Sequence, residues 1–184
     1  MQQLEEPTSL NLTADTCPRE ISAWYALQMR YQCEKRADRV LRDQGFKTLC
    51  PFFTETHRWS DRRKHIETPM FPGYAFVHLT ATPEACVEVL KTPGVVRFIG
   101  YGRALGQVSD QEIAAIERVV SSGLPCASAE FLPIGAKIRV LGGCLDQLEG
   151  ILLEIRGARE VVLSVGAIQR SIRVPIGSYQ FERC

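Results

Sequence analysis

The sequence predicts an α+β domain, in which helices pack on an antiparallel sheet, followed by a small all-β barrel. Two observations lead to this prediction. Between residues 22 and 122 the patterns follow the order strand, helix, two or three strands, helix, strand, helix. After a stretch of small and polar residues, four β-rich runs alternate with glycine-containing turns, which is typical of a small barrel.

The first predicted elements are a strand and a surface helix. Apolar side chains alternate over Ala23–Arg30, as in a strand with two usable faces. From Cys33 to Gln44 the period becomes helical, and Gly45 provides a C-terminal stop. The predicted inner face of this helix consists of Cys33, Ala37, Val40, Leu41 and Gln44.

The next segments are extended. Residues 46–50 form a short strand that ends at Pro51. Residues 52–59 and 66–70 are predicted to be the two arms of a hairpin around a charged loop. The run GYAFVHL, residues 73–79, is a further strand.

Two more helices flank another strand. Pro83–Lys91 is a short helix with proline in its first turn, and VVRFIGY after the Pro93–Gly94 turn is a strand. Ser109 and Glu112 have the spacing of a capping box, which predicts a helix start. The side chains that this last helix is expected to bury are Ile113, Ile116, Val119 and Val120.

These patterns predict four segments: a flexible arm over 1–21, an α+β domain over 22–122, a linker over 123–132 and a barrel over 133–184. The barrel strands are expected in KIRVL, LEGILLEI, EVVLSV and SIRVPI. Because EVVLSV strongly favours β structure, we expect strands rather than a helix across Leu148–Val165.

Composition narrows the possible functions. The 22 Lys and Arg residues nearly balance 21 Asp and Glu residues, so any electrostatic partner must be recognised by local clusters. The seven cysteines show no CxxC spacing, and we therefore expect neither a metal nor another cofactor. No apolar run approaches the ~20 residues of a spanning helix, so we expect a cytoplasmic protein without membrane association.

Two basic segments are candidates for nucleic-acid contact. The loop HRWSDRRKH, residues 57–65, combines four cations with an indole, which suits phosphate neutralisation and base stacking. The first strand and helix add a second basic zone that is partly offset by acidic residues. An ordinary solvated hairpin tip and a solvated helix surface explain the same patterns. The candidate contacts in these two zones are Arg30, Arg36, Arg39, Arg58, Trp59, Arg62, Arg63 and Lys64.

The stretch TPMFPGYAFVHL places aromatic residues around a Pro-Gly step. Strand alternation puts Tyr74, Phe76 and His78 on one face and the small or aliphatic residues between them on the other. The aliphatic face is expected in a core. The aromatic face is either a second core layer or an exposed surface kept for a partner.

No catalytic constellation is recognisable. The three histidines lie near no nucleophile motif, and GxSxG, HExxH and phosphate-loop patterns are absent from the sequence. Nothing in the sequence around the cysteines would activate a thiolate. We therefore expect a binding protein and not an enzyme.

Several motifs together resemble one known family. WYAL at 24–27, QGF at 44–46, FPGYAFV at 71–77, TPGVVRFIG at 92–100 and VSDQEI at 108–113 resemble the N-terminal domain of NusG-family transcription elongation factors. IGAKIRVLGG followed by LEGILLEI, with Gly150 in the expected place, resembles the KOW domain of that family. The resemblance covers residues 23–183 and implies a ferredoxin-like NGN domain followed by a KOW barrel.

The resemblance implies binding to the clamp helices of the largest subunit of RNA polymerase. It implies an apolar groove in which Pro72–Gly73 fixes the turn that presents the aromatic strand. The expected polymerase-binding residues are Phe71, Pro72, Tyr74, Phe76, Ile99 and Tyr101.

The resemblance also implies further partners. The two basic segments would lie toward upstream DNA and the non-template strand. The resemblance also implies nucleic-acid contact by Arg30, Arg36 and Gln44, which fall where specialised members read a pause-site DNA element. The KOW barrel would recruit a small-subunit ribosomal protein or the termination factor Rho through an exposed strand edge near Ile168–Val174. The chain is expected to act as a monomer.

Features such as RYQCEKR, RWSDRRK and VVLSVGAIQRSIRV are similar to UpxY-like specialised antiterminators, which act on particular operons. The chain departs from one specialised branch at Ala85, Cys86 and Val87, which replace a His-Thr-Thr run, and at Pro93, which replaces an arginine. A second hypothesis is a ribosome-associated RNA-binding protein, since KOW barrels also occur in ribosomal proteins.

Overall fold

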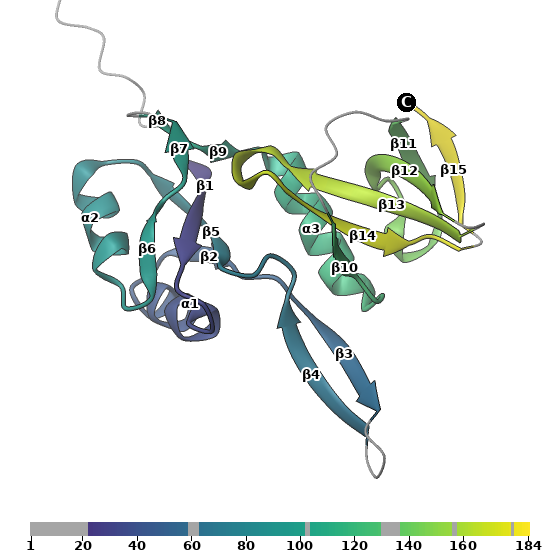
Figure 1. Ribbon diagram of the computed structural model, residues 1–184. Helices are drawn as coiled ribbons and strands as arrows, with labels where there is room; N and C mark the ends of the chain where they lie inside the picture. Colours follow the sequence, from purple (N-terminus) through teal and green to yellow (C-terminus); the bar gives the residue numbers. More distant parts are fainter. Residues whose placement is uncertain (1–21, 59–62, 102–103, 130–136, 156–157, 178) are drawn as a thin grey trace, which may run out of the picture.

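The structure is a computed structural model that describes residues 22–58, 63–101, 104–129, 137–155, 158–177 and 179–184 (Figure 1). These residues form an N-terminal sheet, a C-terminal sheet and three α-helices. Figure 1 shows the third helix between the two sheets.

The N-terminal sheet is antiparallel, with the strand order β2-β5-β1-β6 and with β9 also paired to β1. Its strands are β1 (Ser22–Met29), β2 (Lys47–Leu49), β5 (Tyr74–Thr80), β6 (Val95–Phe98) and β9 (Gln107–Val108). Two hairpins lie off this path: β3 (Phe52–Arg58) pairs with β4 (Arg63–Pro69), and β7 (Gly100–Tyr101) pairs with β8 (Ala104–Leu105).

The three predicted helices are α1 (Glu34–Asp43), α2 (Pro83–Lys91) and α3 (Asp110–Ser122). The Thr82 hydroxyl caps α2 by accepting a hydrogen bond from the Ala85 N–H. The predicted capping box of Ser109 and Glu112 begins α3, and Gly123 ends it in the left-handed region at φ +64°. Local capping chemistry therefore sets the start of α2 and both ends of α3.

The helices cover both faces of the N-terminal sheet. Ala37 and Leu41 of α1 and Val89 of α2 pack in one core, and the inner residues of α3 belong to the other. The prediction that Val120 is buried was wrong, because this side chain is 37% exposed. Successive residues of a helix point about 100° apart, so Val120 turns away when its neighbour Val119 faces the core.

The C-terminal sheet has the strand order β10-β14-β13-β12-β11-β15. Its strands are β10 (Ala127–Ala129), β11 (Lys137–Leu141), β12 (Glu149–Ile155), β13 (Ala158–Val165), β14 (Arg170–Pro175) and β15 (Gln180–Arg183). Two short 3₁₀ helices, η1 (Gly143–Leu145) and η2 (Gly166–Ile168), interrupt the chain between them. Strands β12 and β13 occupy the segment where strands were expected in preference to a helix.

Two expectations for this region were wrong. Ala127–Ala129, which we assigned to the linker, forms strand β10. It pairs antiparallel with β14, with Ser128 opposite Ile172, so the strand edge predicted to be exposed is already occupied. The physical reason is that an edge strand offers unpaired N–H and C=O groups, and a nearby segment can satisfy them whatever its side chains.

Gly150 lies at a close approach of β12 to β13. A Cβ atom on Gly150 would be 2.4 Å from Cγ1 of Val161 and 2.8 Å from the carbonyl oxygen of Val162. Both distances are shorter than real Cβ contacts, and the second involves backbone that cannot rotate away. This packing requires glycine at position 150.

Among the described residues, no helix is both long enough and apolar enough to cross a membrane.

Candidate functional site

The aromatic residues near residue 75 lie on one face of the N-terminal sheet. In the antiparallel pairing of β1 with β5, Ala26 lies opposite Phe76 and Gln28 opposite Tyr74. The intervening Ala75, Val77 and Leu79 belong to the core beneath α1 and α2. The predicted division of this strand into an aliphatic face and an aromatic face is confirmed.

The turn before β5 is held by three hydrogen bonds. Gly73 has φ +79°, a conformation that favours glycine. Its carbonyl accepts from the Met29 N–H over 2.8 Å, and its own N–H donates to Oε1 of Glu34 over 2.9 Å. The Tyr74 N–H donates to the Phe71 carbonyl over 3.0 Å. The turn therefore fixes the direction in which the aromatic residues leave the sheet.

We call Phe71, Pro72, Tyr74, Phe76 and Ile99 the aromatic face. The rings of Phe71 and Phe76 meet edge to face, with 5.9 Å between centroids and an interplanar angle of 87°. Ile99 joins the same surface, and its N–H donates to the Ala26 carbonyl over 2.8 Å. The backbone of Tyr101 lies in β7, but its side chain is outside the described part of the structure.

The aromatic face is largely covered in this structure, in contrast to the open groove that we expected. Phe71 is 1% exposed and Phe76 is 0% exposed, whereas Tyr74 is half-buried and Pro72 is exposed. The core cluster that contains these rings also contains residues of α3 and of the C-terminal sheet. The sequence analysis allowed a second core layer as an alternative, and the burial of Phe71 and Phe76 agrees with it.

A cavity of about 250 Å³ marks where the C-terminal sheet adjoins the aromatic face. It is lined by Met70, Phe71, Pro72 and Tyr74 together with Ala129, Arg170 and Ser171. The last three residues belong to β10 and β14. The partial exposure of Tyr74 and Pro72 thus occurs at the boundary between the two sheets.

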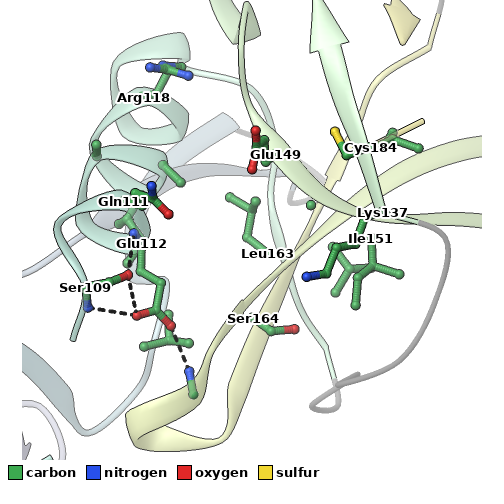
Figure 2. Close-up of a pocket in the computed structure, with 18 of the residues that line it drawn as sticks. Ser109, Gln111, Glu112, Arg118, Lys137, Glu149, Ile151, Leu163, Ser164 and Cys184 are labelled. Atoms are coloured by element: carbon green, nitrogen blue, oxygen red, sulfur yellow. Dashed lines mark hydrogen bonds between the residues drawn. The ribbon is translucent and has the colours of Figure 1, made fainter. Parts of the chain in front are cut away.

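A larger cleft of about 590 Å³ is lined by one side of α3 and by part of the C-terminal sheet (Figure 2). Apolar side chains such as Ile116, Ile138 and Leu163 line it, with Arg118 and Lys137 among the charged lining residues. Figure 2 shows that Glu112 connects the helix to the sheet at one end of the cleft. The lining carries no convergent set of catalytic groups among the described residues.

The first basic zone lies on and beside α1. Arg30, Arg36 and Arg39 are exposed, and none of them forms an ion pair with a residue that the structure describes. Gln44 is also exposed, but its Oε1 accepts a hydrogen bond from the Thr92 hydroxyl over 3.0 Å. The three arginines are therefore available to an external anion, whereas the Gln44 carbonyl already has an intramolecular partner.

The second basic zone is the β3–β4 hairpin, which projects from the N-terminal sheet in Figure 1. The base of the hairpin is attached to α1, because Lys35 pairs with Glu67 and lies 4.9 Å from the centre of the Phe52 ring. The two zones therefore meet at the base of the hairpin and diverge toward its tip.

Backbone pairing in the hairpin places Arg58 opposite Arg63 and His57 opposite Lys64. The side chains of these strand residues are outside the described part of the structure. The predicted contacts Trp59 and Arg62 lie entirely outside the described residues.

Cysteine reactivity and metal binding receive no support from the described residues. Burial raises the pKa of the Cys50 thiol to about 12, with the nearby carboxylates of Asp38 and Glu34 adding to the shift. Burial also raises the pKa of the Cys126 thiol to about 11. Within the described chain, no group of three or more His, Cys, Asp or Glu side chains is placed to hold a metal ion.

Comparison with known proteins gives the family. A family model described as "Transcription termination factor nusG" matches residues 22–117. The chain belongs to the NusG family. Its relatives include the transcription termination/antitermination protein NusG of Synechocystis sp., which is 30% identical over 161 residues that cover 74% of this chain and 76% of the relative.

A further relative and a solved structure are also similar to this NusG-family chain. The Lactococcus lactis protein of the same name is 28% identical over 157 residues, covering 83% of this chain and 80% of the relative. A solved structure titled "Domain interaction in Thermotoga maritima NusG" has a TM-score of 0.52 and 19% identity, covering 89% of this chain and 97% of that one. The similarity to the Lactococcus lactis protein supports the family, and the similarity to the Thermotoga maritima structure supports the fold. The chain is a transcription termination/antitermination factor.

Two residues that matter to this NusG-family site were missed by the sequence analysis. Glu34 was not assigned to any face, yet it is 3% exposed and holds the turn at Gly73. Glu112 was identified as a cap, but its contact with the C-terminal sheet was not. A charged residue inside an otherwise solvated helix surface gives no periodic signal, so no pattern could have identified the contact at Gly73.

Proposed function

We propose that this NusG-family chain binds RNA polymerase through the aromatic face and suppresses pausing or termination. Its proposed partner is the coiled coil of the clamp helices on the largest subunit. The observation that supports this proposal is the Phe71–Tyr74–Phe76 constellation on a turn that three hydrogen bonds hold in place. Rigid aromatic residues at the end of a strand suit the reception of a helix, because they provide large contact area at low entropic cost.

The proposed mechanism is a shift of population and involves no bond chemistry. A protein that binds one conformation of the polymerase better than another favours that conformation by its difference in affinity. Binding the clamp in its closed state would therefore raise processivity. No cofactor or catalytic group is needed for this action.

Nucleic acid is the second proposed partner. The exposed Arg36 and Arg39 lack internal ion pairs with described residues, and the hairpin register places Arg58 directly opposite Arg63. Like charges opposite each other in a ladder repel unless an anion lies between them. We propose that upstream DNA or the non-template strand supplies this anion, and that base recognition restricts the factor to particular operons, as in UpxY-like paralogues.

The C-terminal sheet is proposed to be a KOW barrel over 133–184, to which β10 (Ala127–Ala129) adds an edge strand, and which follows a ferredoxin-like NGN domain near 22–122. The close approach at Gly150 supports this proposal. A small-subunit ribosomal protein or Rho is the proposed partner of the barrel. Pairing with the edge of β14 would require β10 to leave that edge first.

The test is the affinity of purified chain for a bacterial RNA polymerase, together with pausing on a long template. Replacing Tyr74 with alanine removes a half-buried aromatic residue from the aromatic face. Loss of a central aromatic contact costs about 2 kcal/mol or more, so the dissociation constant should rise about 30-fold. The matched control is Tyr31→Ala, because Tyr31 is 75% exposed and lies outside the aromatic face.

Each outcome has a meaning. Weaker binding by Y74A with unchanged binding by Y31A supports the aromatic face as the docking surface. Equal binding by both variants overturns that assignment. If the unaltered chain does not bind polymerase but binds ribosomal RNA with steep salt dependence, the ribosome-associated alternative replaces the proposal.

A further inference from the structure

The cleft of Figure 2, about 590 Å³ in volume, has a helical wall with small side chains at its centre. Residues that are three and four apart on a helix lie on one face. Along α3 this face carries Gln111, Ala114, Ala115 and Arg118, so a polar group lies at each end and two alanines lie between them. The short alanine side chains leave room between α3 and the C-terminal sheet.

The opposite wall of the cleft belongs to the C-terminal sheet and is mainly apolar. Lys137 of β11 lies opposite Ile151 of β12, and Ile151 lies opposite Val162 of β13. Residues directly opposite each other share a face of the sheet, so a cation and two aliphatic side chains form one row. Ile138 and Leu163 add to the apolar lining. A volume of this size is within the range of about 300–1,000 Å³ that small-molecule sites occupy.

Two carboxylates line the cleft, and both already have partners within the chain. Oε2 of Glu112 accepts from the Ser109 N–H and hydroxyl, each over 2.9 Å, and Oε1 accepts from the Gly166 N–H over 3.0 Å. Glu149 pairs with Arg139 over 2.6 Å. Neither carboxylate is therefore available to neutralise a cation of the cleft.

The two cations of the lining, Arg118 and Lys137, differ from the carboxylates in this respect. Neither forms an ion pair with a residue that the structure describes. Arg118 is partly buried and Lys137 is exposed, so both reach solvent where the cleft opens. They come from opposite walls, one from α3 and one from β11 (Figure 2). The charge without an internal partner at this opening is positive, and it favours an anion.

We propose that the cleft binds a free amphipathic organic anion, a small molecule with an apolar body and one carboxylate or sulfonate head. The body lies between the alanines of α3 and the aliphatic side chains of the C-terminal sheet, and the head meets Arg118 and Lys137. Burial of the body supplies most of the affinity, because exposed ion pairs contribute little. A free molecule is favoured over a lipid surface, since a flat bilayer cannot reach apolar residues recessed between a helix and a sheet. The inference does not depend on polymerase binding.

The first measurement uses anilinonaphthalene sulfonate, an apolar dye with one anionic head, and the full chain. We expect its fluorescence to report a site with a dissociation constant on the order of 10 μM. Decanoate below its micelle-forming concentration should displace the dye. Decanol has the same chain length without the charge and should displace it about tenfold less effectively. Equal displacement by both compounds would overturn the assignment of an anion.

A tryptophan on the helical wall tests the location. Ala114 lines the cleft and is exposed, so Ala114→Trp fills the cleft without removing a core side chain. The matched control is Val120→Trp, because Val120 lies on the same helix, is 37% exposed and is not part of the lining. We expect the dye to bind Ala114→Trp at least about tenfold more weakly and Val120→Trp without change. Circular dichroism of both variants checks that they are folded. Equal dye affinity in the two would overturn the site.

Charge variants test the recognition of the head and keep the proposal testable should Ala114→Trp not fold. Arg118→Gln and Lys137→Gln change side chains that reach solvent, so the core stays intact. Each should weaken decanoate binding about threefold and leave decanol binding unaltered. The control is Lys91→Gln, because Lys91 is an exposed cation of α2 that does not line the cleft. Unchanged decanoate affinity in both cleft variants would overturn the role of the cations.

Two further results would overturn the proposal. Dye that decanoate does not displace, and that Ala114→Trp does not weaken, is an adventitious additive only. Cosedimentation of the chain with phosphatidylglycerol vesicles, lost in Ala114→Trp, would replace the free molecule by a lipid surface; we expect no cosedimentation. All of these measurements are made without polymerase, so their outcome is separate from that of the proposed function.

Discussion

Glu34 supplies the sharpest test of how the turn beneath the aromatic face is held. Its carboxylate is 3% exposed and accepts the Gly73 N–H over 2.9 Å, while the N-cap residue Cys33 gives α1 no side-chain cap. Glu34→Ala removes a hydrogen bond to a charged acceptor, which contributes about 1.5–3 kcal/mol, and leaves the Gly73 N–H without its partner. It also removes a negative charge from the first turn of a helix, which contributes about 0.3–1 kcal/mol.

Relief of the desolvation of Glu34 offsets part of this loss, so we expect Glu34→Ala to lower the free energy of unfolding by about 2–3 kcal/mol. For a chain of this size each kcal/mol lowers the melting temperature by about 2–4 °C, which gives a fall of roughly 4–12 °C. Glu34→Gln keeps an acceptor oxygen at the same place and should lose about half as much.

The measurement is thermal and urea-induced unfolding followed by circular dichroism. Glu88→Ala is the control, since Glu88 is an exposed acidic residue of α2 and should change the unfolding free energy by less than about 0.5 kcal/mol. If Glu34→Ala unfolds within that same margin of the unaltered chain, the carboxylate does not hold the turn and the reasoning is refuted.

Three further predictions concern other parts of the chain. Gly150→Ala should lower the free energy of unfolding by about 1–3 kcal/mol, because its Cβ would lie 2.8 Å from the Val162 carbonyl oxygen. The control Gly166→Ala should leave the free energy of unfolding nearly unchanged. Equal melting temperatures of the two variants would contradict this prediction. Replacing both Arg36 and Arg39 with serine should reduce the slope of log affinity for DNA against log salt concentration by roughly 1.5–2. The control, a single Arg183→Ser change on β15, should leave this slope unaltered. The free energy of unfolding should decline as the pH rises from about 9 toward 11. The reason is that burial raises the thiol pKa of folded Cys50 to about 12 and that of Cys126 to about 11, so the folded chain keeps protons that the unfolded chain releases. Cys126→Ala should weaken this decline, as measured by urea unfolding at a series of pH values.

Much of the structure over residues 22–122 could be predicted, because the residues that determine its helices and strands are close together in the sequence. The capping box at Ser109 and Glu112 requires two residues three apart, and its geometry is present in the structure. The alternation of Tyr74, Ala75 and Phe76 between two cores follows from strand geometry alone. Such features depend on neighbours within a few residues, and the sequence states these neighbours directly.

Features that depend on distant segments were missed. The partner of Glu34 is 39 residues away in sequence, and nothing in the first turn of α1 indicates it. Ala127–Ala129 has no strand signal of its own and becomes a strand because β14 has a free edge beside it. The burial of Phe76 likewise depends on the position of the C-terminal sheet, which hydrophobic periodicity does not specify.

Glu112 shows how a local motif can have a tertiary role that its pattern conceals. A capping box is satisfied by either Glu or Gln, because the reciprocal hydrogen bond needs one acceptor oxygen. A carboxylate has a second oxygen, and here it accepts the Gly166 N–H 54 residues away. A glutamine would present an amide NH₂ to one of these two backbone donors, and could accept from the cap or from Gly166 but not from both. The physical requirement for glutamate at this position therefore comes from the contact between α3 and η2, and the cap alone does not impose it.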